Sequence, residues 1–193
     1  MTEKSNIVLA SGSPRRLEML KMMGISDFKV IPDTSEEVVI SGLSPQEQVC
    51  GLSLQKAQNV AKLCSTDEIV IAADTLVYLD NEPLGKPDSQ TDADRMLRKL
   101  SGRKHSVFTG VTIIKKETCI SHAEKTDVFF RDITDSEIKA YVETGEPMDK
   151  AGAYAAQGGA AVFISRIEGD FFNVVGLPLC RLSMMLKELN IIK

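Results

Sequence analysis

The sequence predicts an α/β protein with a mixed β-sheet flanked by helices. Residues 7–10 form a short apolar run that leads through a loop into a helical pattern, as in a βα unit. Residues 69–73 form a near-continuous apolar run, which is typical of a strand buried on both faces. Two β-rich stretches, 106–115 and 126–130, follow each other without an intervening helix, which indicates a hairpin. Crossover units combined with a hairpin predict both parallel and antiparallel pairing.

The helices are predicted from apolar periodicity and from their capping residues. Ser44 and Glu47 form a capping box around Pro45, so a long helix begins there. Thr91 and Thr134 are each followed three residues later by an acidic residue and are predicted to cap two further helices. The expected helices are 14–23, 45–63, 91–100, 134–145 and 178–189, and the further strands are 28–31, 75–79, 162–167 and 171–175.

Length and composition are those of one globular domain spanning residues 1–193. The chain is 43% hydrophobic and 26% charged. A net charge of −4, without runs of lysine or arginine, argues against a nucleic-acid polymer as partner. No apolar stretch approaches the roughly 20 residues of a membrane span, and the N-terminus is unlike a secretory signal. The four scattered cysteines are expected to be buried free thiols, which favours a cytoplasmic location.

Two arginines lie at the start of the first predicted helix, where the backbone is already electropositive. Ser13 is predicted as the N-cap and Pro14 fits the first helical position, so Arg15 and Arg16 fall in the first turn. This arrangement costs a few tenths to about 1 kcal/mol unless an anion shares the site. Backbone N–H groups, hydroxyls and guanidinium groups at one helix start can bind a phosphate. The alternative is a solvated helix start whose arginines face water.

Asp74 follows the buried run 69–73, where an unpaired carboxylate would be costly. Because residues 76–79 continue the strand pattern, Asp74 is not expected to cap a helix. Two interpretations remain. Asp74 either holds a bulge or turn together, or serves as a cation ligand or general base near an entering water. Lys86 lies between a glycine and a proline in extended backbone, and this motif alone favours a surface lysine over a functional one.

A charged pair and a run of small residues lead to Gln157, whose amide could pair with the edge of a nucleobase. Alone, a surface loop explains this segment as well. The helix-start arginines, the separate lysines and the acidic residues Glu36, Glu37 and Asp74 together indicate a triphosphate bound with a divalent ion. The chain contains neither the P-loop pattern nor the glycine-rich dinucleotide fingerprint.

A series of short motifs occurs in order along the chain, at residues 10–16, 36–37, 52–57, 73–75, 85–87, 100–102, 146–154, 157–158 and 175–178. Together they resemble, over essentially the whole chain, the Maf family of nucleoside triphosphate pyrophosphatases. These house-cleaning enzymes hydrolyse a nucleotide to a monophosphate and pyrophosphate. The resemblance implies a Maf/ITPase-like fold: an elongated, curved mixed sheet flanked by helices, with two lobes and an active-site cleft between them.

With this resemblance, the candidate residues are assigned roles. Asp74 is expected to orient or deprotonate the attacking water and to bind Mg²⁺ or Mn²⁺ together with Glu37. Hydroxyl and cationic side chains are expected to hold the triphosphate: Ser11, Ser13, Arg15, Arg16, Lys56 and Lys86.

Within the family, Arg15, Thr75 and Gln157 match the branch that acts on dTTP and UTP rather than the branch that acts on N7-methylated GTP. Ala155 and Ala156 depart from the usual glycine and larger aliphatic residue, which leaves the strength of base selection open. The alternatives are a non-catalytic nucleotide-binding regulator of septum formation and a pyrophosphatase for other non-standard nucleotides. Dimers are common among relatives, so a homodimer is an expected assembly, and no membrane partner is expected.

Overall fold

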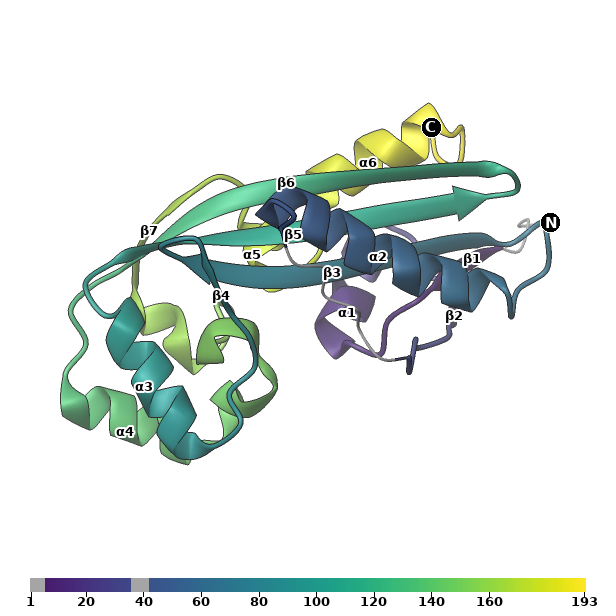
Figure 1. Cartoon of the computed structure of the whole chain (residues 1–193). Helices are drawn as coiled ribbons and strands as arrows, with labels where there is room; N and C mark the ends of the chain where they lie inside the picture. The colour runs from purple at the N-terminus through teal and green to yellow at the C-terminus, as the bar shows by residue number, and fades with distance from the viewer. Residues whose placement is uncertain (1–5, 36–41) are drawn as a thin grey trace. The chain divides into compact units, whose positions relative to one another are not determined.

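A computed structural model describes residues 6–35 and 42–193 of the chain (Figure 1). Its strands are β1 (Ile7–Leu9), β2 (Lys29–Val30), β3 (Ile69–Leu79), β4 (Glu82–Leu84), β5 (Lys104–Lys115), β6 (Thr118–Phe130) and β7 (Ile164–Glu168). They form one seven-stranded sheet in the order β2-β1-β3-β5-β6-β7, with β4 paired to β3. β1 is parallel to both β2 and β3, whereas β4 and β7 are antiparallel to their partners. The predicted mixed sheet is confirmed.

The helices begin close to the predicted capping residues. They are α1 (Pro14–Met22), α2 (Pro45–Ala61), α3 (Gln90–Leu100), α4 (Asp135–Glu143), α5 (Phe171–Val175) and α6 (Leu179–Glu188), with short 3-10 helices η1 (Glu146–Asp149), η2 (Ala151–Ala153) and η3 (Gly159–Phe163). Ser44 and Thr134 cap α2 and α4 with both hydrogen bonds of a capping box. These two sequence signals are therefore confirmed as helix starts.

The chain folds as two compact units, in agreement with the two lobes expected. Unit 1 comprises Met1–Asp74, Thr109–Glu124 and Gly176–Lys193, and unit 2 comprises Thr75–Phe108 and Lys125–Val175. Three strands, β3, β5 and β6, contribute residues to both units.

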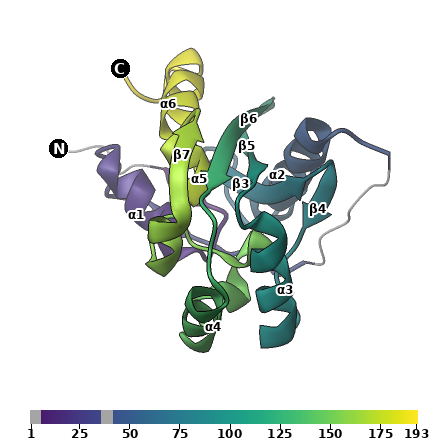
Figure 2. The ribbon, with the colours of Figure 1, turned by 90° about the vertical axis from the view of Figure 1, so that its left-hand side faces the viewer.

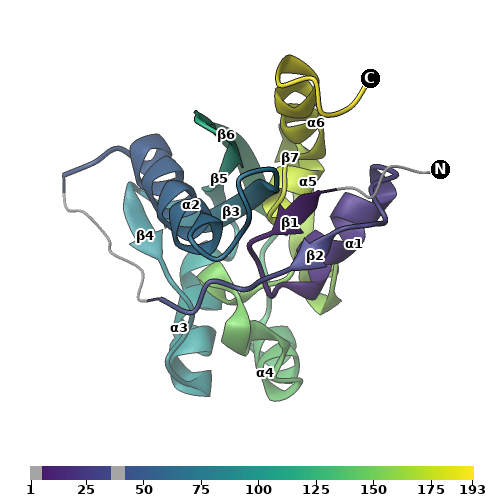
Figure 3. The ribbon, with the colours of Figure 1, turned by 90° about the vertical axis from the view of Figure 1, so that its right-hand side faces the viewer.

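In unit 1, helices cover both faces of the strands. α2 lies on one face, and α1 and α6 lie on the other (Figure 2 and Figure 3). Val8, Val70 and Ala72 are buried in one cluster with Ala57 and Val60 of α2. Because alternate residues of a strand point to opposite faces, this cluster identifies the residues of β1 and β3 that face α2.

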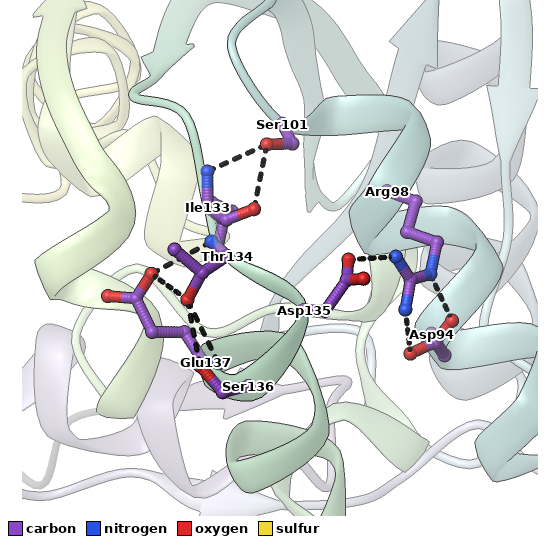
Figure 4. A network of polar contacts seen from close by, with 8 residues as sticks. All are labelled: Asp94, Arg98, Ser101, Ile133, Thr134, Asp135, Ser136 and Glu137. Carbon is purple, nitrogen blue, oxygen red and sulfur yellow. Dashed lines mark hydrogen bonds and ion pairs between the residues drawn. The ribbon is translucent and has the colours of Figure 1, made fainter.

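In unit 2, α3 and α4 share an apolar core and are also joined by polar contacts near their ends (Figure 4). Arg98 of α3 pairs with Asp94 of the same helix and with Asp135 at the start of α4. The hydroxyl of Ser101 accepts a hydrogen bond of 2.8 Å from the N–H of Ile133, just before α4. These contacts fix the start of α4 against α3.

The structure corrects the expected strand at residues 171–175, which is the helix α5. Its apolar and β-branched residues favour a strand. However, the Asp170 carboxylate accepts a hydrogen bond of 2.8 Å from the N–H of Phe172, which caps a helical turn. The buried amide of Asn173 then donates to the Val107 carbonyl and to the Thr126 hydroxyl, each at 3.0 Å. Local capping and this long-range anchor override strand propensity.

The start of α3 is also corrected. The N-cap is Ser89, whose hydroxyl accepts a hydrogen bond of 3.1 Å from the N–H of Asp92. Thr91, the expected cap, already lies inside the helix. Both residues precede an aspartate by three positions, so the sequence pattern alone did not distinguish them.

The cysteines are free, as expected, but they are not all buried. Cys50 and Cys64 are half-buried, and Cys119 and Cys180 are exposed. The strand that contains Cys119, β6, begins at Thr118 instead of residue 126, because its first half is a polar stretch with little apolar signal. Within the described part of the chain, no helix is both long and apolar enough to cross a membrane.

Candidate functional site

The loops that follow two parallel strands of unit 1 lie at one edge of the sheet. The N–H of Ala10 donates to the Ile71 carbonyl at 2.8 Å, and the N–H of Ile31 donates to the Leu9 carbonyl at 3.1 Å. β3 continues beyond the end of β1, so its residues 72–74 lie along this edge. In open α/β sheets, ligands bind outside the carboxyl ends of the parallel strands. This edge is therefore the candidate site.

Asp74 faces α2 because of its position in the strand. Ala72 packs against α2, and Asp74, two residues further on, points to the same side. Its carboxylate forms an ion pair with the ammonium group of Lys56 on α2. The two side chains are 7% and 15% exposed, respectively. Because β3 runs unbroken from Ile69 to Leu79, Asp74 does not close a turn. A cation in contact favours the ionised carboxylate, the form needed by a base or metal ligand.

Arg16 is held in place by two hydrogen bonds within unit 1. Its Nε donates to the Gly176 carbonyl at 2.8 Å, and its Nη1 donates to the Ser11 hydroxyl at 3.2 Å. The Ser11 hydroxyl also accepts from the N–H of Ser13 at 3.2 Å. Ser11 therefore orders the loop before α1 and orients Arg16. Gly176 belongs to the motif at residues 175–178, to which the sequence assigned no role. Its contact with Arg16 gives this motif a structural role.

The start of α1 combines several groups that bind anions. Ser13 is the N-cap, as predicted, but its hydroxyl makes no capping hydrogen bond within the described residues. Arg15 is half-buried and makes no hydrogen bond or ion pair to the part of the chain that the structure describes. The first turn contains no acidic residue. Backbone N–H groups, a hydroxyl and a guanidinium group are thus available to an anion.

Asp33 is a further acidic residue on this side of unit 1, and sequence reasoning did not select it. Its carboxylate accepts hydrogen bonds from the N–H and hydroxyl of Ser35, at 3.2 and 2.8 Å, and from the Asn59 amide at 3.4 Å. Partial burial acts to raise the pKa of Asp33, but these hydrogen bonds and the charge of Lys56 lower it more. The only sequence signal was an acidic residue in the polar segment after the predicted strand 28–31.

Thr75 and Lys86 belong to unit 2. Thr75 follows Asp74 in β3 and therefore points to the opposite face of the strand. Lys86 is exposed in the loop between β4 and α3. The carbonyl of Gly85 accepts a hydrogen bond of 2.9 Å from the N–H of Gly152, which joins this loop to the segment that leads to Gln157.

Gln157 is exposed at the corner of a tight turn in unit 2. The N–H of Gly158 donates to the Ala155 carbonyl at 3.0 Å and closes the turn. The Gln157 amide makes no hydrogen bond to the described residues, so both its donor and its acceptor are available to a ligand. Tyr141 and Glu146 contact the two ends of this turn, and the sequence analysis did not identify either.

The predicted site residues thus fall into two sets. Those in unit 1 are Ser11, Ser13, Arg15, Arg16, Lys56 and Asp74, and those in unit 2 are Thr75, Lys86 and Gln157. Glu37, the second predicted metal ligand, lies outside the described residues.

A divalent cation bound with a triphosphate is compatible with the residues present. Mg²⁺ is commonly held by one or two carboxylates together with substrate phosphates and waters. Asp74 supplies one buried carboxylate at this edge of the sheet. Within residues 6–35 and 42–193, no group of three or more histidine, cysteine, aspartate or glutamate side chains could hold a metal ion. A site shared with substrate phosphates does not need such a group.

Comparison with known proteins identifies the family. A family model described as Maf-like protein matches residues 6–189. The chain belongs to the Maf family. A dTTP/UTP pyrophosphatase from Bacillus cereus (strain AH820) is 46% identical over 185 residues, with 96% of each chain covered. A dTTP/UTP pyrophosphatase from Geotalea uraniireducens (strain Rf4) is 47% identical over the full length of both chains.

The fold of this Maf protein is also found in a solved structure of a HAM1 protein from Coxiella burnetii. The TM-score is 0.52 at 20% sequence identity, and the match covers 94% of this chain and 98% of that chain. At this identity the likeness concerns the fold alone. It agrees with a mixed sheet flanked by helices.

Proposed function

We propose that this Maf protein is a nucleoside triphosphate pyrophosphatase that hydrolyses dTTP and UTP to the monophosphate and pyrophosphate. The observation that carries the proposal is the buried Lys56–Asp74 pair at the sheet edge from which the loop before α1 leaves. A carboxylate and an anion-binding helix start can together serve water-dependent cleavage of a triphosphate. Two relatives with near-complete coverage and this activity in their names support the substrate assignment.

The triphosphate is bound by cationic groups and backbone N–H groups. Arg15 and the start of α1 supply the first contacts, and Arg16, oriented by Ser11 and Gly176, adds a second guanidinium group. Ser13, Lys56 and Lys86 complete the proposed phosphate ligands. These groups spread the charge that develops on the phosphate oxygens, which is the main source of catalysis in phosphoryl transfer.

Asp74 is the proposed general base. It accepts a proton from the attacking water while the water oxygen forms a bond to phosphorus. The bridging bond between the α and β phosphoryl groups breaks, and pyrophosphate leaves. Lys56 keeps the carboxylate charged and oriented for this transfer. A divalent cation, Mg²⁺ or Mn²⁺, held by Asp74 and Glu37, would supply Lewis-acid stabilisation of the phosphate charge.

Thr75 and Gln157 are the proposed readers of the base, with Arg15 completing the specificity set. Uracil and thymine present two carbonyl acceptors on either side of an N–H donor, and a carboxamide can satisfy one of each. Cytosine has an amino group in place of one carbonyl, so a donor opposite it loses its partner. An unpaired donor in a closed site costs about 1–3 kcal/mol, which is sufficient for selection.

The proposal also covers the cellular location, assembly and partners of the enzyme. One domain spanning residues 1–193 would carry out the reaction in the cytoplasm, where nucleotides are abundant and free cysteines stay reduced. A homodimer is the proposed assembly, and neither a membrane nor a nucleic-acid polymer is required as partner.

The test is pyrophosphate release from a panel of dTTP, UTP, CTP, dCTP, GTP and N7-methyl-GTP with Mg²⁺ or Mn²⁺. We expect selective turnover of dTTP and UTP, reduced on the order of 10²-fold or more by Asp74→Asn. Asp80→Asn is a matched control, because Asp80 follows the same strand and pairs with Arg103 on the surface. Tight binding of dTTP without turnover would instead favour a nucleotide-binding regulator, and turnover of other nucleotides would reject the substrate assignment.

A further inference from the structure

The turn that presents Gln157 is fixed at both ends by side chains from outside it. At its first end, the hydroxyl of Tyr141 on α4 accepts a hydrogen bond of 3.1 Å from the N–H of Ala155. Tyr141 is buried, and its ring packs edge-on against Phe163 at a centroid distance of 5.5 Å. The phenol therefore has a defined position from which to hold the backbone.

At the second end, the carboxylate of Glu146 accepts a hydrogen bond of 2.9 Å from the N–H of Gly159. Burial raises the pKa of the Tyr141 phenol, and the neighbouring Glu146 carboxylate is the second cause that raises it. Together, Tyr141 and Glu146 bridge the backbone on either side of Gln157.

The two glycines of the turn make room for this bridge. A Cβ atom added to Gly158 would lie 2.1 Å from Oε1 of Glu146, and one added to Gly159 would lie 3.2 Å from the Tyr141 ring. The Glu146 carboxylate could reach its present position only beside a residue without a side chain. The space for the Glu146 carboxylate and the Tyr141 ring thus depends on the two glycines.

We propose that Tyr141 and Glu146 are positioning residues for Gln157 and that they set the selectivity of this protein for uracil and thymine over cytosine. This inference rests on the proposed function, in which Gln157 contacts the base. Neither residue needs to touch the substrate. They act by fixing the backbone from which the amide projects.

The physical reason is that a carboxamide has no selectivity unless its orientation is fixed. Its oxygen accepts and its nitrogen donates, so a rotation of the amide converts a partner for uracil into a partner for cytosine. A rigid turn holds the amide at one position against the base edge, where uracil or thymine can pair with it. A mobile turn lets Gln157 adapt to either base. Loss of the bridge should therefore lower selectivity while the preferred substrate is still hydrolysed.

The first test is Tyr141→Phe, which removes the hydrogen bond to the N–H of Ala155 and keeps the ring. We expect the ratio of kcat/KM for UTP to that for CTP to fall about tenfold, as for the loss of one discriminating hydrogen bond. We expect kcat for UTP to change much less. Hydrogen exchange should become faster at the N–H group of Ala155. Tyr78→Phe is the matched control, since Tyr78 is a half-buried tyrosine of the same unit that packs edge-on against Phe108.

A second test does not depend on the folding of the tyrosine variant. Gly158→Ala should displace the Glu146 carboxylate by contact with the new Cβ, at little cost because the end of that side chain is flexible. We expect it to lower the UTP-to-CTP ratio as Tyr141→Phe does. In a Glu146→Ala background the new methyl group has room, so Gly158→Ala should cause no further loss. A full additional loss in that background would overturn the proposal.

Gln157→Ala separates this inference from the proposed function. If Gln157→Ala leaves the UTP-to-CTP ratio unchanged, Gln157 does not read the base, and both the base assignment and the positioning role are wrong. A second outcome is that Gln157→Ala lowers the UTP-to-CTP ratio while Tyr141→Phe accelerates hydrogen exchange and leaves this ratio unchanged. In that case the base assignment stands and the positioning role is overturned. A fall in the ratio with both variants supports both.

Discussion

At the scale of single residues, Lys56 and Asp74 couple stability to catalysis. Lys56→Met would leave a largely buried carboxylate without its lysine, which should lower the free energy of unfolding by about 3 kcal/mol. Adding Asp74→Asn removes the buried charge and should restore most of that stability. Turnover should remain lost in the double variant, because no base is present. Urea unfolding and pyrophosphate release measured on the wild type, both single variants and the double variant would check this.

Recovery of turnover in that double variant would assign the base elsewhere, with Glu37 the next candidate. If Lys56→Met is as stable as the wild type, the ion pair serves catalysis and does not stabilise the fold. The two measurements therefore separate a structural role from a catalytic one.

His105 links stability to pH in a part of unit 2 that the proposed reaction does not use. Its Nε2 lies 2.8 Å from the Tyr154 hydroxyl, and its Nδ1 has no hydrogen-bond partner among the described residues. Burial lowers its pKa from 6.5 to about 4, and the charge of Asp127 opposes this only in part. In the unfolded chain the imidazole gains its proton near pH 6.5, whereas in the folded chain it stays neutral until about pH 4. Stability is therefore complete above pH 6.5 and falls as the pH is lowered towards 4.

The expected loss from His105 is about 2 kcal/mol between pH 7 and pH 5, from 1.36 kcal/mol per pH unit below 6.5. The measurement is urea unfolding at both pH values for the wild type and for His105→Gln, which cannot titrate. The wild type should lose about 2 kcal/mol more than this variant. His122→Gln replaces an exposed histidine and serves as the control. Equal pH dependence of wild type and His105→Gln would contradict the expectation.

Among the candidate site residues, those with a local signature could be selected from the sequence. Arg15 and Arg16 were found because proline and serine fix the start of α1, and Asp74 because a charge follows a buried apolar run. The contacts of Glu146 and Tyr141 could not be found in this way. They hold backbone N–H groups rather than a recognisable partner side chain, and no sequence spacing records such a contact.

At the scale of elements, α3 gives a direct test of a helix cap. Ser89→Ala removes the hydroxyl that accepts from the Asp92 N–H and should lower the free energy of unfolding by about 1 kcal/mol. Thr91→Ala is the matched control, because Thr91 is exposed inside the helix and alanine is the better helix former. We expect that variant to be as stable as the wild type within about 0.5 kcal/mol. A larger loss from Thr91→Ala than from Ser89→Ala would place the cap at Thr91.

Local sequence signals suffice to locate some helices and strands but not others. A capping box with a proline at the first position located α2, because its two hydrogen bonds are local. α5 was mistaken for a strand because Asn173 is anchored by Val107 and Thr126, which are far away in sequence. The strand order could not be predicted either. That β1 lies between β2 and β3 depends on the pairing of whole strands, which no local pattern specifies.

At the scale of the whole molecule, the distribution of charge predicts how a metal would bind. The net charge is −4, yet the described part of the site in unit 1 pairs Asp74 with Lys56 and adds Arg15 and Arg16. Such a site attracts an anion more strongly than a free cation. We therefore expect Mg²⁺ or Mn²⁺ to bind together with the nucleotide, whose phosphates supply the missing negative charge and further oxygen ligands.

Calorimetric titration would check this expectation. Mn²⁺ added to the nucleotide-free protein should give no binding in the micromolar range, and Mn²⁺ added with a non-hydrolysable dTTP analogue should bind at that level. EDTA should stop turnover, and added Mn²⁺ should restore it. The melting temperature of the nucleotide-free protein should be the same with and without EDTA, because a ligand that does not bind the folded state cannot stabilise it. Micromolar binding of Mn²⁺ without nucleotide would mean instead that Glu37 and Asp74 already form a metal site, and that Lys56 does not neutralise it.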